Sequence, residues 1–164
     1  MTRKFEKISF GQFKKDVNCL CQNDSNNVYK SIQLPQRATA KSAGYDFYTP
    51  VGFKLAPNKT IKIPIGVKAY MEDDEVLKIH PRSSLGFKYH LRLSNSTGII
   101  DSDYVDNPDN EGHIWIKLCN EGDETVTIQP NEAIAQGIFH KYLITNDDSF
   151  DGEKREGGIG STND

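Results

Sequence analysis

The sequence has no apolar segment of the roughly 18–20 residues that a membrane-spanning helix requires, and residues 1–6 lack the apolar stretch of a secretory signal. Cysteine is scarce as well. The chain has three, an odd number that fits a reducing cytosolic setting better than a disulfide framework. Cys19 and Cys21 form a C-x-C without a second pair nearby, which indicates free thiols rather than a zinc site. These absences predict a cytoplasmic protein without a membrane partner.

The chain also lacks an excess of positive charge. Its formal net charge of −3 argues against nucleic-acid binding, because that function usually needs a broad basic surface. The same charge does not exclude a polyphosphate ligand, since a few local donors and a divalent cation are enough to hold one.

Several familiar site motifs are missing. No G-x-x-x-x-G-K-[ST] is present, which excludes a P-loop nucleotidase. The acidic run from Asp101 to Glu111 does not match a calcium loop, because Val105, Asp106 and Gly112 stand where a carboxylate, a glycine and a glutamate are needed. The histidines form no H-x-x-x-H pair, so we expect solvated strand residues rather than metal ligands at His80, His90, His113 and His140.

What is present begins with a distinct N-terminal segment. Ser9 and Gln12 fit a capping box, Ile8 and Phe13 are spaced as a hydrophobic staple, and apolar residues then recur at Phe13, Val17 and Leu20. This spacing predicts an amphipathic helix of about three turns that ends at a polar linker, residues 23–27. We therefore expect residues 1–30 to form a helical extension with a linker, packed on the chain's own domain. A helix that binds a partner or supports a trimer is the alternative.

From Ser31 onward, apolar and polar residues alternate in short segments separated by turn residues. The segments are Phe53–Leu55, Thr60–Ile63, Val67–Tyr70, Val76–Ile79, Ile114–Leu118, Val126–Ile128 and Ile134–Phe139. Many short strands at close spacing are typical of all-β folds, so we predict a distorted jelly-roll β-barrel over residues 31–147. Residues 148–164 are rich in glycine, serine and charge, and we expect a flexible C-terminal arm there.

Polar residues gather in five islands, at residues 43–47, 81–85, 98–104, 131–136 and 155–162. Together they suit attack of water on a phosphoryl group, which needs a carboxylate to activate the water, donors for the oxygens and a metal ion on the phosphates. Asp101 fits the carboxylate, and donors are available in Arg82, Ser83, Ser84 and Gln136. The glycine-rich residues 157–162 add backbone amides that can fold around an anion.

In this order, the five islands closely resemble the five motifs of trimeric dUTP diphosphatases (dUTPases), over roughly residues 34–162. The resemblance implies Mg²⁺-dependent hydrolysis of dUTP to dUMP and pyrophosphate by water attack on the α-phosphate. That reaction limits uracil in DNA and supplies dUMP for thymidylate synthesis. The resemblance also implies a homotrimer with three sites, each assembled from three subunits.

The resemblance assigns a role to each island. Asp101 would activate the water, and Tyr104 would pack on the deoxyribose and exclude a 2′-hydroxyl. Asn95, with Gly98, Ile100 and backbone groups of its hairpin, would bind and read the uracil nucleoside. The phosphates would meet Arg82, Ser83, Ser84 and Gln136, and Asp46 would hold metal-bound water. The terminal island would close over the γ end of the triphosphate through Arg155, Gly160, Ser161 and Thr162.

The chain departs from the family pattern in three places. Ile159 replaces the aromatic residue of the tail that stacks on uracil, residues 105–110 are an insertion, and the N-terminal helix is additional. An aliphatic side chain cannot provide ring stacking. Tyr89, or else Phe87, is our candidate for supplying the ring, the alternative being a surface aromatic on a strand.

Two other functions are compatible with a fold of this type. dCTP deaminases share the fold but use a glutamate in the strand after the third motif, where this chain has Lys117, which cannot act as that base. A dUTPase-like nucleotide sensor that grips a regulatory protein partner is the second alternative. The joint presence of Asp101, Tyr104, Gln136 and Arg155 favours catalysis, although the two roles can coexist.

Overall fold

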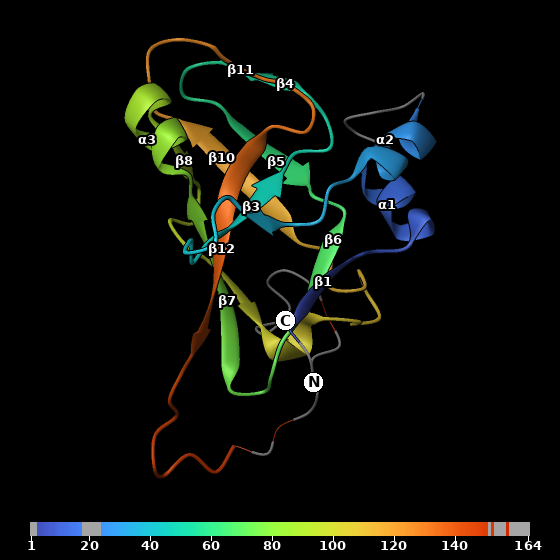
Figure 1. Cartoon of the computed structure of the whole chain (residues 1–164), viewed down its shortest axis with the longest axis vertical. Coiled ribbons are helices and arrows are strands. Elements are labelled where there is room, and N and C mark those ends of the chain that lie inside the picture. Colours follow the sequence, from blue (N-terminus) through green and yellow to red (C-terminus); the bar gives the residue numbers. More distant parts are fainter. Residues whose placement is uncertain (1–2, 18–23, 151, 153–156, 158–164) are drawn as a thin grey trace.

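The computed structural model describes residues 3–17, 24–150, 152 and 157, and most of its elements are short β-strands (Figure 1). In chain order the elements are β1 (Lys4–Lys7), α1 (Phe10–Val17), α2 (Ser25–Ser31), β2 (Gln36–Arg37), β3 (Tyr45–Tyr48), β4 (Phe53–Leu55), β5 (Thr60–Pro64), β6 (Val67–Tyr70), β7 (Glu75–Pro81), α3 (Ser83–Tyr89), β8 (Leu91–Leu93), β9 (Gly98–Asp101), the 3₁₀ turn η1 (Ser102–Tyr104), β10 (Trp115–Asn120), β11 (Val126–Ile128) and β12 (Ala133–Lys141).

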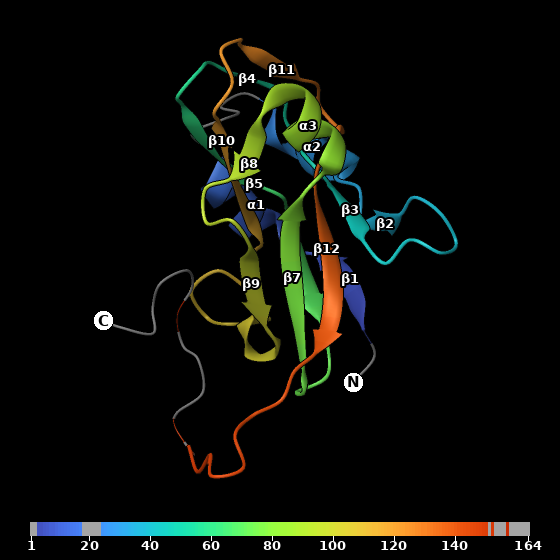
Figure 2. The same ribbon diagram turned by 90° about the vertical axis from the view of Figure 1, so that its left-hand side faces the viewer.

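Among the described residues, the strands form four antiparallel sheets, ordered β2-β3-β12-β7-β9, β5-β10-β8, β1-β6 and β4-β11. The largest sheet has β12 and β7 at its centre, and Figure 2 shows these strands side by side with β9. Apart from β2 and β3, which are consecutive, the paired strands are not consecutive in the sequence, as expected for a jelly roll. The predicted all-β class is confirmed, and the arrangement is consistent with the predicted jelly-roll type.

All seven predicted strands are confirmed, and their ends differ from the predicted ones by no more than two residues. They are β4, β5, β6, β7, β10, β11 and β12. Burial alternates along β6, β10 and β11, as period-2 patterning requires, whereas β7 and β12 at the centre of the large sheet bury consecutive residues. The core is tight at the centre of the large sheet. A Cβ on Gly137 would lie 2.6 Å from Cε2 of Phe47 and 3.0 Å from Cδ1 of Leu77. Glycine is therefore needed where β12 crosses these side chains.

The N-terminal segment packs on the same core. β1 pairs with β6, and Phe13 and Val17 of α1 are fully buried in the hydrophobic core. Half of the predicted capping box is confirmed, because the amide of Gln12 donates to Oγ of Ser9 at 3.1 Å. The reciprocal half is wrong: the Gln12 side chain bonds Asp16, and Glu111 accepts the Ser9 amide instead, at 2.8 Å.

The polar linker predicted over residues 23–27 is wrong from Ser25 onward, where α2 begins. This helix is held by tertiary contacts that local polarity does not reveal. The ring of Tyr29 lies 5.3 Å from that of Phe10 and 5.7 Å from that of Phe13, and its hydroxyl donates to the carbonyl of Ile8 at 2.7 Å. Figure 1 shows α2 against α1, at one side of the strands.

Beyond β12 the described chain leaves the sheets. Figures 1 and 2 show residues 142–150 running away from the strands, and Leu143 and Phe150 are 97% and 87% exposed. The prediction of a flexible arm over residues 148–164 falls mostly outside the described residues. None of the described helices has the length and apolarity needed to span a membrane.

Candidate active site

The islands within the described chain come together at two separate places. The first, here called the donor cluster, consists of Asp46, Arg82, Ser83, Ser84 and Gln136. Its members line a cavity of about 440 Å³ together with residues of the β2–β3 loop. Asp46 and Gln136 are register partners on β3 and β12, while Arg82 follows β7 and precedes α3. The sheet order thus joins three islands that are far apart in the sequence.

An ion pair and two hydrogen bonds orient Arg82 and Gln136 in the donor cluster. Nε of Arg82 lies 3.2 Å from Oδ1 of Asp46, and its Nη1 donates to the carbonyl of Ala133 at 3.3 Å. Nε2 of Gln136 donates to the carbonyl of Pro81 at 3.1 Å. The opposite amide atom, Oε1, faces Gly44, where a Cβ would come within 2.7 Å of it. Gly44 therefore leaves room for the glutamine beside the cavity.

Ser83 and Ser84 form the exposed first turn of α3. The first N–H groups of a helix have no acceptor within the helix, so they are available to an anion together with the two hydroxyls. The guanidinium of Arg82 precedes them and offers a planar set of donors. The donor cluster is thus chemically suited to phosphate oxygens.

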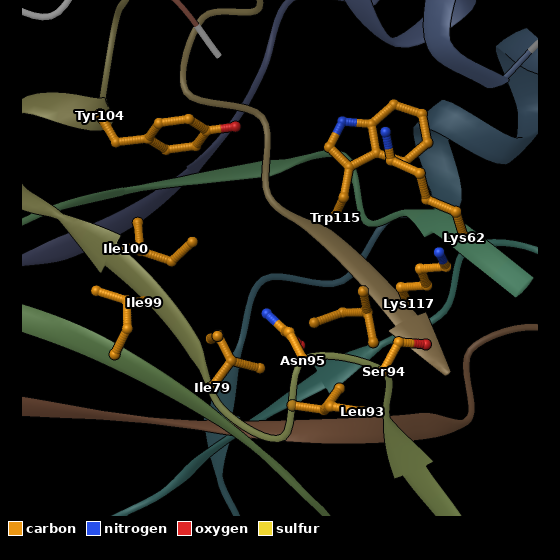
Figure 3. A pocket seen from close by; sticks show the side chains of 12 residues that line it. Lys62, Ile79, Leu93, Ser94, Asn95, Ile99, Ile100, Tyr104, Trp115 and Lys117 are labelled. Atoms are coloured by element: carbon orange, nitrogen blue, oxygen red, sulfur yellow. The ribbon is translucent and has the colours of Figure 1, made fainter. Parts of the chain in front are cut away.

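The second place, here called the nucleoside pocket, is a cavity of about 380 Å³ between the β8–β9 turn, η1 and β10. It is lined by Lys62, Ile79, Leu93, Ser94, Asn95, Gly98, Ile99, Ile100, Tyr104, Trp115, Ile116 and Lys117. Figure 3 shows the rings of Tyr104 and Trp115 on one side, and Asn95 on the other. The lining is mostly apolar with a few polar groups, as expected for a site that takes a base and a sugar.

A tight turn shapes the wall of this pocket. Ser96 adopts a left-handed conformation with φ of 61°, and the amide of Thr97 donates to the carbonyl of Asn95 at 2.6 Å. Behind the turn, a Cβ on Gly98 would lie 3.1 Å from Cβ of Ile79. Asn95 is thereby presented at the pocket by a backbone that is closely packed against β7.

Tyr104 is 5% exposed, and its ring borders the pocket. Its hydroxyl donates to the carbonyl of His113 at 2.9 Å. Asp101 ends β9 and immediately precedes η1, but its side chain is not among those that line the pocket. The candidate carboxylate therefore follows two pocket-lining residues in the sequence, Ile99 and Ile100, but is not itself part of the lining.

Within one chain, Asp101 is far from the donor cluster. Gln136 pairs with His80 of β7, whereas Asp101 pairs with Val76 of the same strand. These two positions on β7 are four residues apart, which corresponds to about 13 Å along a strand. Figure 2 shows α3 beyond one end of β7, and β9 pointing toward the other end. The two places share no lining residue.

Metal-ligand chemistry is sparse around both places. Among the residues that the structure describes, no group of three or more His, Cys, Asp or Glu side chains is placed to hold a metal ion. Asp46 is the one carboxylate that lines the donor cluster's cavity. A cation there would have to take most of its ligands from a bound substrate and from water.

Two histidines depart from the prediction that all four are solvated strand residues. His90 is exposed, but it caps the C-terminus of α3 rather than lying in a strand. His113 precedes β10 and is fully buried, with Nε2 accepting from the amide of Gly66 at 2.8 Å and Nδ1 lying 2.6 Å from Oδ2 of Asp16. Because Nε2 must accept from a backbone N–H, the ring is neutral and its proton sits on Nδ1. Burial lowers the pKa of His113, and the opposing effect of Asp16 does not reverse this. The ring is structural.

The candidate stacking rings lie on α3 rather than on a strand. Tyr89 is half-buried and packs against the core, whereas Phe87 is 88% exposed. The predicted tail residues Arg155, Ile159, Gly160, Ser161 and Thr162 lie outside the described residues.

Sequence reasoning missed several residues that line the nucleoside pocket. Lys62 and Trp115 meet there, with Nζ of Lys62 4.2 Å from the ring centroid. The sequence signal that could have identified Trp115 as a pocket residue is that it is the sole tryptophan of the chain and lies in a strand of alternating apolar and polar residues. Lys117 also lines the pocket, although the sequence had marked it only as unsuited to deamination.

The comparisons with known proteins agree with one another. The dUTPase family profile matches residues 30–163. The chain is 45% identical over 132 residues to a deoxyuridine 5′-triphosphate nucleotidohydrolase of Lactococcus lactis, covering 80% of this chain and 88% of the relative. It is 38% identical over 142 residues to the corresponding enzyme of Tolumonas auensis, covering 82% and 90%.

The fold agrees with solved structures. The crystal structure of a dUTPase from Streptococcus mutans matches with a TM-score of 0.68 and 37% identity, over 87% of this chain and 98% of that one. A D95N variant of a dUTPase from phage phi11 of S. aureus, described as coordinating a structural Mg(II) ion, matches with a TM-score of 0.66 over 93% and 98% of the two chains. At 17% identity, that second likeness extends to the fold alone. By profile, sequence and structure, this chain belongs to the dUTPase family.

Proposed function

We propose that this protein hydrolyses dUTP to dUMP and pyrophosphate. The observation that carries the proposal is the chemical difference between two cavities of the structure. One cavity holds amide, hydroxyl and guanidinium donors, and the other is an apolar pocket of nucleoside size lined by residues of β9, the strand that ends at Asp101. Membership in the dUTPase family supports joining the two in one reaction.

In the proposed reaction, Asp101 accepts a proton from a water molecule as the water oxygen attacks the α-phosphorus. The bond between that phosphorus and the oxygen bridging to the β-phosphate breaks, and pyrophosphate leaves with the bonding electrons. Positioning and charge neutralisation account for most of the acceleration in such reactions. Arg82, Gln136 and the first turn of α3 would neutralise and orient the phosphate oxygens, since a guanidinium fork matches them in geometry.

We further propose that the pocket selects the substrate. Asn95, Gly98 and Ile100 would read uracil together with backbone groups of the β8–β9 turn. The close packing of Gly98 on Ile79, behind this turn, supports exclusion of a 5-methyl group. Tyr104 would pack against the deoxyribose and leave no room for a 2′-hydroxyl. Tyr89 or Phe87 would supply the stacking ring that Ile159 cannot.

Mg²⁺ is the proposed cofactor. A triphosphate beside Asp46 suits a hard cation that takes most of its ligands from phosphate oxygens and water, with the carboxylate holding one of those waters. When bound, the ion would neutralise charge that develops on the phosphates.

The separation of Asp101 from the donor cluster supports a homotrimer. Because one chain keeps them about 13 Å or more apart along β7, we propose that the donor cluster of one copy meets the nucleoside pocket of another. Three symmetric sites would result. Arg155, Gly160, Ser161 and Thr162 are proposed to close the site from the third copy. A regulatory protein partner stays a prediction, since no described contact favours one.

The test is release of pyrophosphate from dUTP, dTTP, UTP and dCTP, with and without Mg²⁺. We expect rapid release from dUTP with Mg²⁺ and little from the other three nucleotides. Absence of pyrophosphate from dUTP in the presence of Mg²⁺ would refute the proposal, and release of ammonia from dCTP would favour the deaminase alternative.

A further inference from the structure

The hydroxyl of Tyr104 is held by two partners that come from outside its own motif. It donates to the carbonyl of His113 at 2.9 Å, and it accepts from Nδ2 of Asn110, also at 2.9 Å. Asn110 belongs to the insertion of residues 105–110. A ring held at its tip from two sides cannot tilt freely, so both bonds bear on where the ring sits in the nucleoside pocket.

The direction of these bonds follows from the surrounding network. Oδ1 of Asn110 accepts from the amide of Gly112 at 3.0 Å and from Nδ2 of Asn107 at 2.8 Å. A backbone N–H can only donate, so the other atom of the Asn110 amide must be the nitrogen. That nitrogen faces the phenol, and the phenolic proton is therefore directed to His113. The amide cannot be flipped without breaking two bonds.

The insertion is closed on itself by Asn107, which is 4% exposed. Its Nδ2 donates to the carbonyl of Tyr104 at 2.7 Å, and its Oδ1 accepts from the amides of Asp109 and Asn110 at 3.1 and 3.0 Å. Every polar atom of this buried side chain is therefore paired, as a stable buried network requires. The hydrogen bonds of Asn107 therefore hold the insertion together and join it to Tyr104.

Two carboxylates tie the insertion and the residue after it to the N-terminal half of the chain. Asp106 accepts from Lys68 and from the hydroxyl of Tyr70, the latter at 2.8 Å. Next to the insertion, Glu111 accepts from the amide and hydroxyl of Ser9 at 2.8 and 2.6 Å. The insertion is thus braced on β6 and at the start of α1, and cannot shift without breaking these contacts.

We propose that Asn110 is a specificity-determining positioning residue, which holds the Tyr104 ring at the angle that excludes a ribose 2′-hydroxyl. The inference rests on the proposed function and assigns a role to the insertion. Once the Asn110 bond is lost, the ring tip can swing about its side-chain torsions and open space beside the sugar. UTP then gains far more than dUTP, because only UTP carries the hydroxyl that needs the space.

The experiment compares kcat/KM for dUTP and for UTP in the Asn110→Ala variant. We expect the dUTP to UTP ratio to fall about three- to tenfold, in line with the net free energy of one hydrogen bond. Asp109→Ala is the matched control, because Asp109 lies in the same loop and only its backbone amide bonds Asn107. Its ratio should equal that of the unsubstituted protein.

A role limited to folding would give a different result. Partial unfolding removes active molecules and lowers both kcat/KM values by the same factor, so the ratio would stay constant. A constant ratio in Asn110→Ala overturns the proposal. Should that variant fail to fold, Tyr104→Phe retains the ring and removes only the hydroxyl, and it should lower the ratio in the same direction. An unchanged ratio there also overturns the proposal.

The two proposals fail in distinguishable ways. If the unsubstituted protein does not hydrolyse dUTP, the proposed function is refuted, and this inference with it. If the unsubstituted protein hydrolyses dUTP and discriminates against UTP, but both variants discriminate equally well, only the role of Asn110 is refuted.

Discussion

Asp46 and Arg82 form an ion pair across the donor cluster, with 3.2 Å between Oδ1 and Nε. The pair uses the Nε edge of the guanidinium, while Nη1 reaches the carbonyl of Ala133. Both side chains are partly shielded from water. The arginine is therefore oriented before any substrate arrives, and a pre-oriented donor loses less entropy on binding.

Arg82→Lys tests the value of this oriented fork. Lysine keeps the charge but cannot make the same parallel bonds, so we expect kcat/KM for dUTP to fall by about one to two orders of magnitude. Steady-state pyrophosphate release measures it. Arg92→Lys is the control, because Arg92 forms an exposed ion pair with Glu121, and such pairs contribute little. Equal activity of both variants would show that Arg82 does not bind the substrate.

Asp101→Asn should keep nucleotide binding and lose turnover. An amide cannot accept the proton of the attacking water, so kcat should fall by about two to four orders of magnitude. Titration with a non-hydrolysable dUTP analogue should give a dissociation constant close to that of the unsubstituted protein. Asp103→Asn, an exposed neighbour in η1, should retain full activity. Parental turnover by Asp101→Asn would show that another group activates the water.

The two candidate stacking rings can be separated by substitution. Phe87 is exposed on α3, whereas Tyr89 is half-buried against the core. Phe87→Ala should therefore raise the KM for dUTP about fivefold or more without a loss of thermal stability, if its ring stacks on uracil. Tyr89→Ala should lower stability through lost packing, and an unchanged KM rules Tyr89 out. Unchanged KM values in both variants would mean that neither ring stacks.

The burial of His113 predicts that the folded protein loses stability in mild acid. Burial lowers its pKa below that of the unfolded chain, which is about 6.5, so the unfolded state binds more protons as pH falls below that value. The contribution is complete above pH of about 6.5 and decreases toward pH 5, by at most about 1.4 kcal/mol per pH unit for one proton. Asp16 does not interfere in this window. Burial would raise its pKa, but bonds from His113 and Gln12 lower it, so its contribution is lost only in stronger acid.

Thermal unfolding between pH 7.5 and 5 measures this effect. His113→Gln should be less stable at pH 7.5 and should show a flatter pH dependence. His140→Gln, at an exposed position of β12, should keep the parental slope. A parental slope in His113→Gln would assign the titration to another group.

Alternation of apolar and polar residues predicts seven of the strands, but it does not predict the remaining strands or the helices α2 and α3. Alternation predicts a strand only when several residues share it, so β8 and β9 were missed between turn residues, and β3 was hidden within the first island. α2 depends on Tyr29 packing against α1, and α3 begins at a serine pair without apolar periodicity. Contacts between distant segments decide these elements, and no local window contains them.

The candidate site divides in the same way. The family resemblance identifies all five of the central site residues. The structure brings Asp46, Arg82 and Gln136 together in the donor cluster, and it places Asn95 and Tyr104 together in the nucleoside pocket. Which residues meet depends on the sheet order, and spacing along the chain does not encode it. The bonds of Asn110 to Tyr104, which come from the insertion, were likewise out of reach of motif reasoning.

Complementation between two inactive variants tests most directly whether copies share a site. Arg82→Ala and Asp101→Asn, each purified alone, should be nearly inactive. Trimers assembled from an equal mixture should regain activity, because about a quarter of the sites would take Arg82 from one variant and Asp101 from the other. Recovery of roughly that fraction of parental dUTP hydrolysis is the predicted result. Activity no higher than that of the separate variants would contradict a site completed by a neighbouring copy.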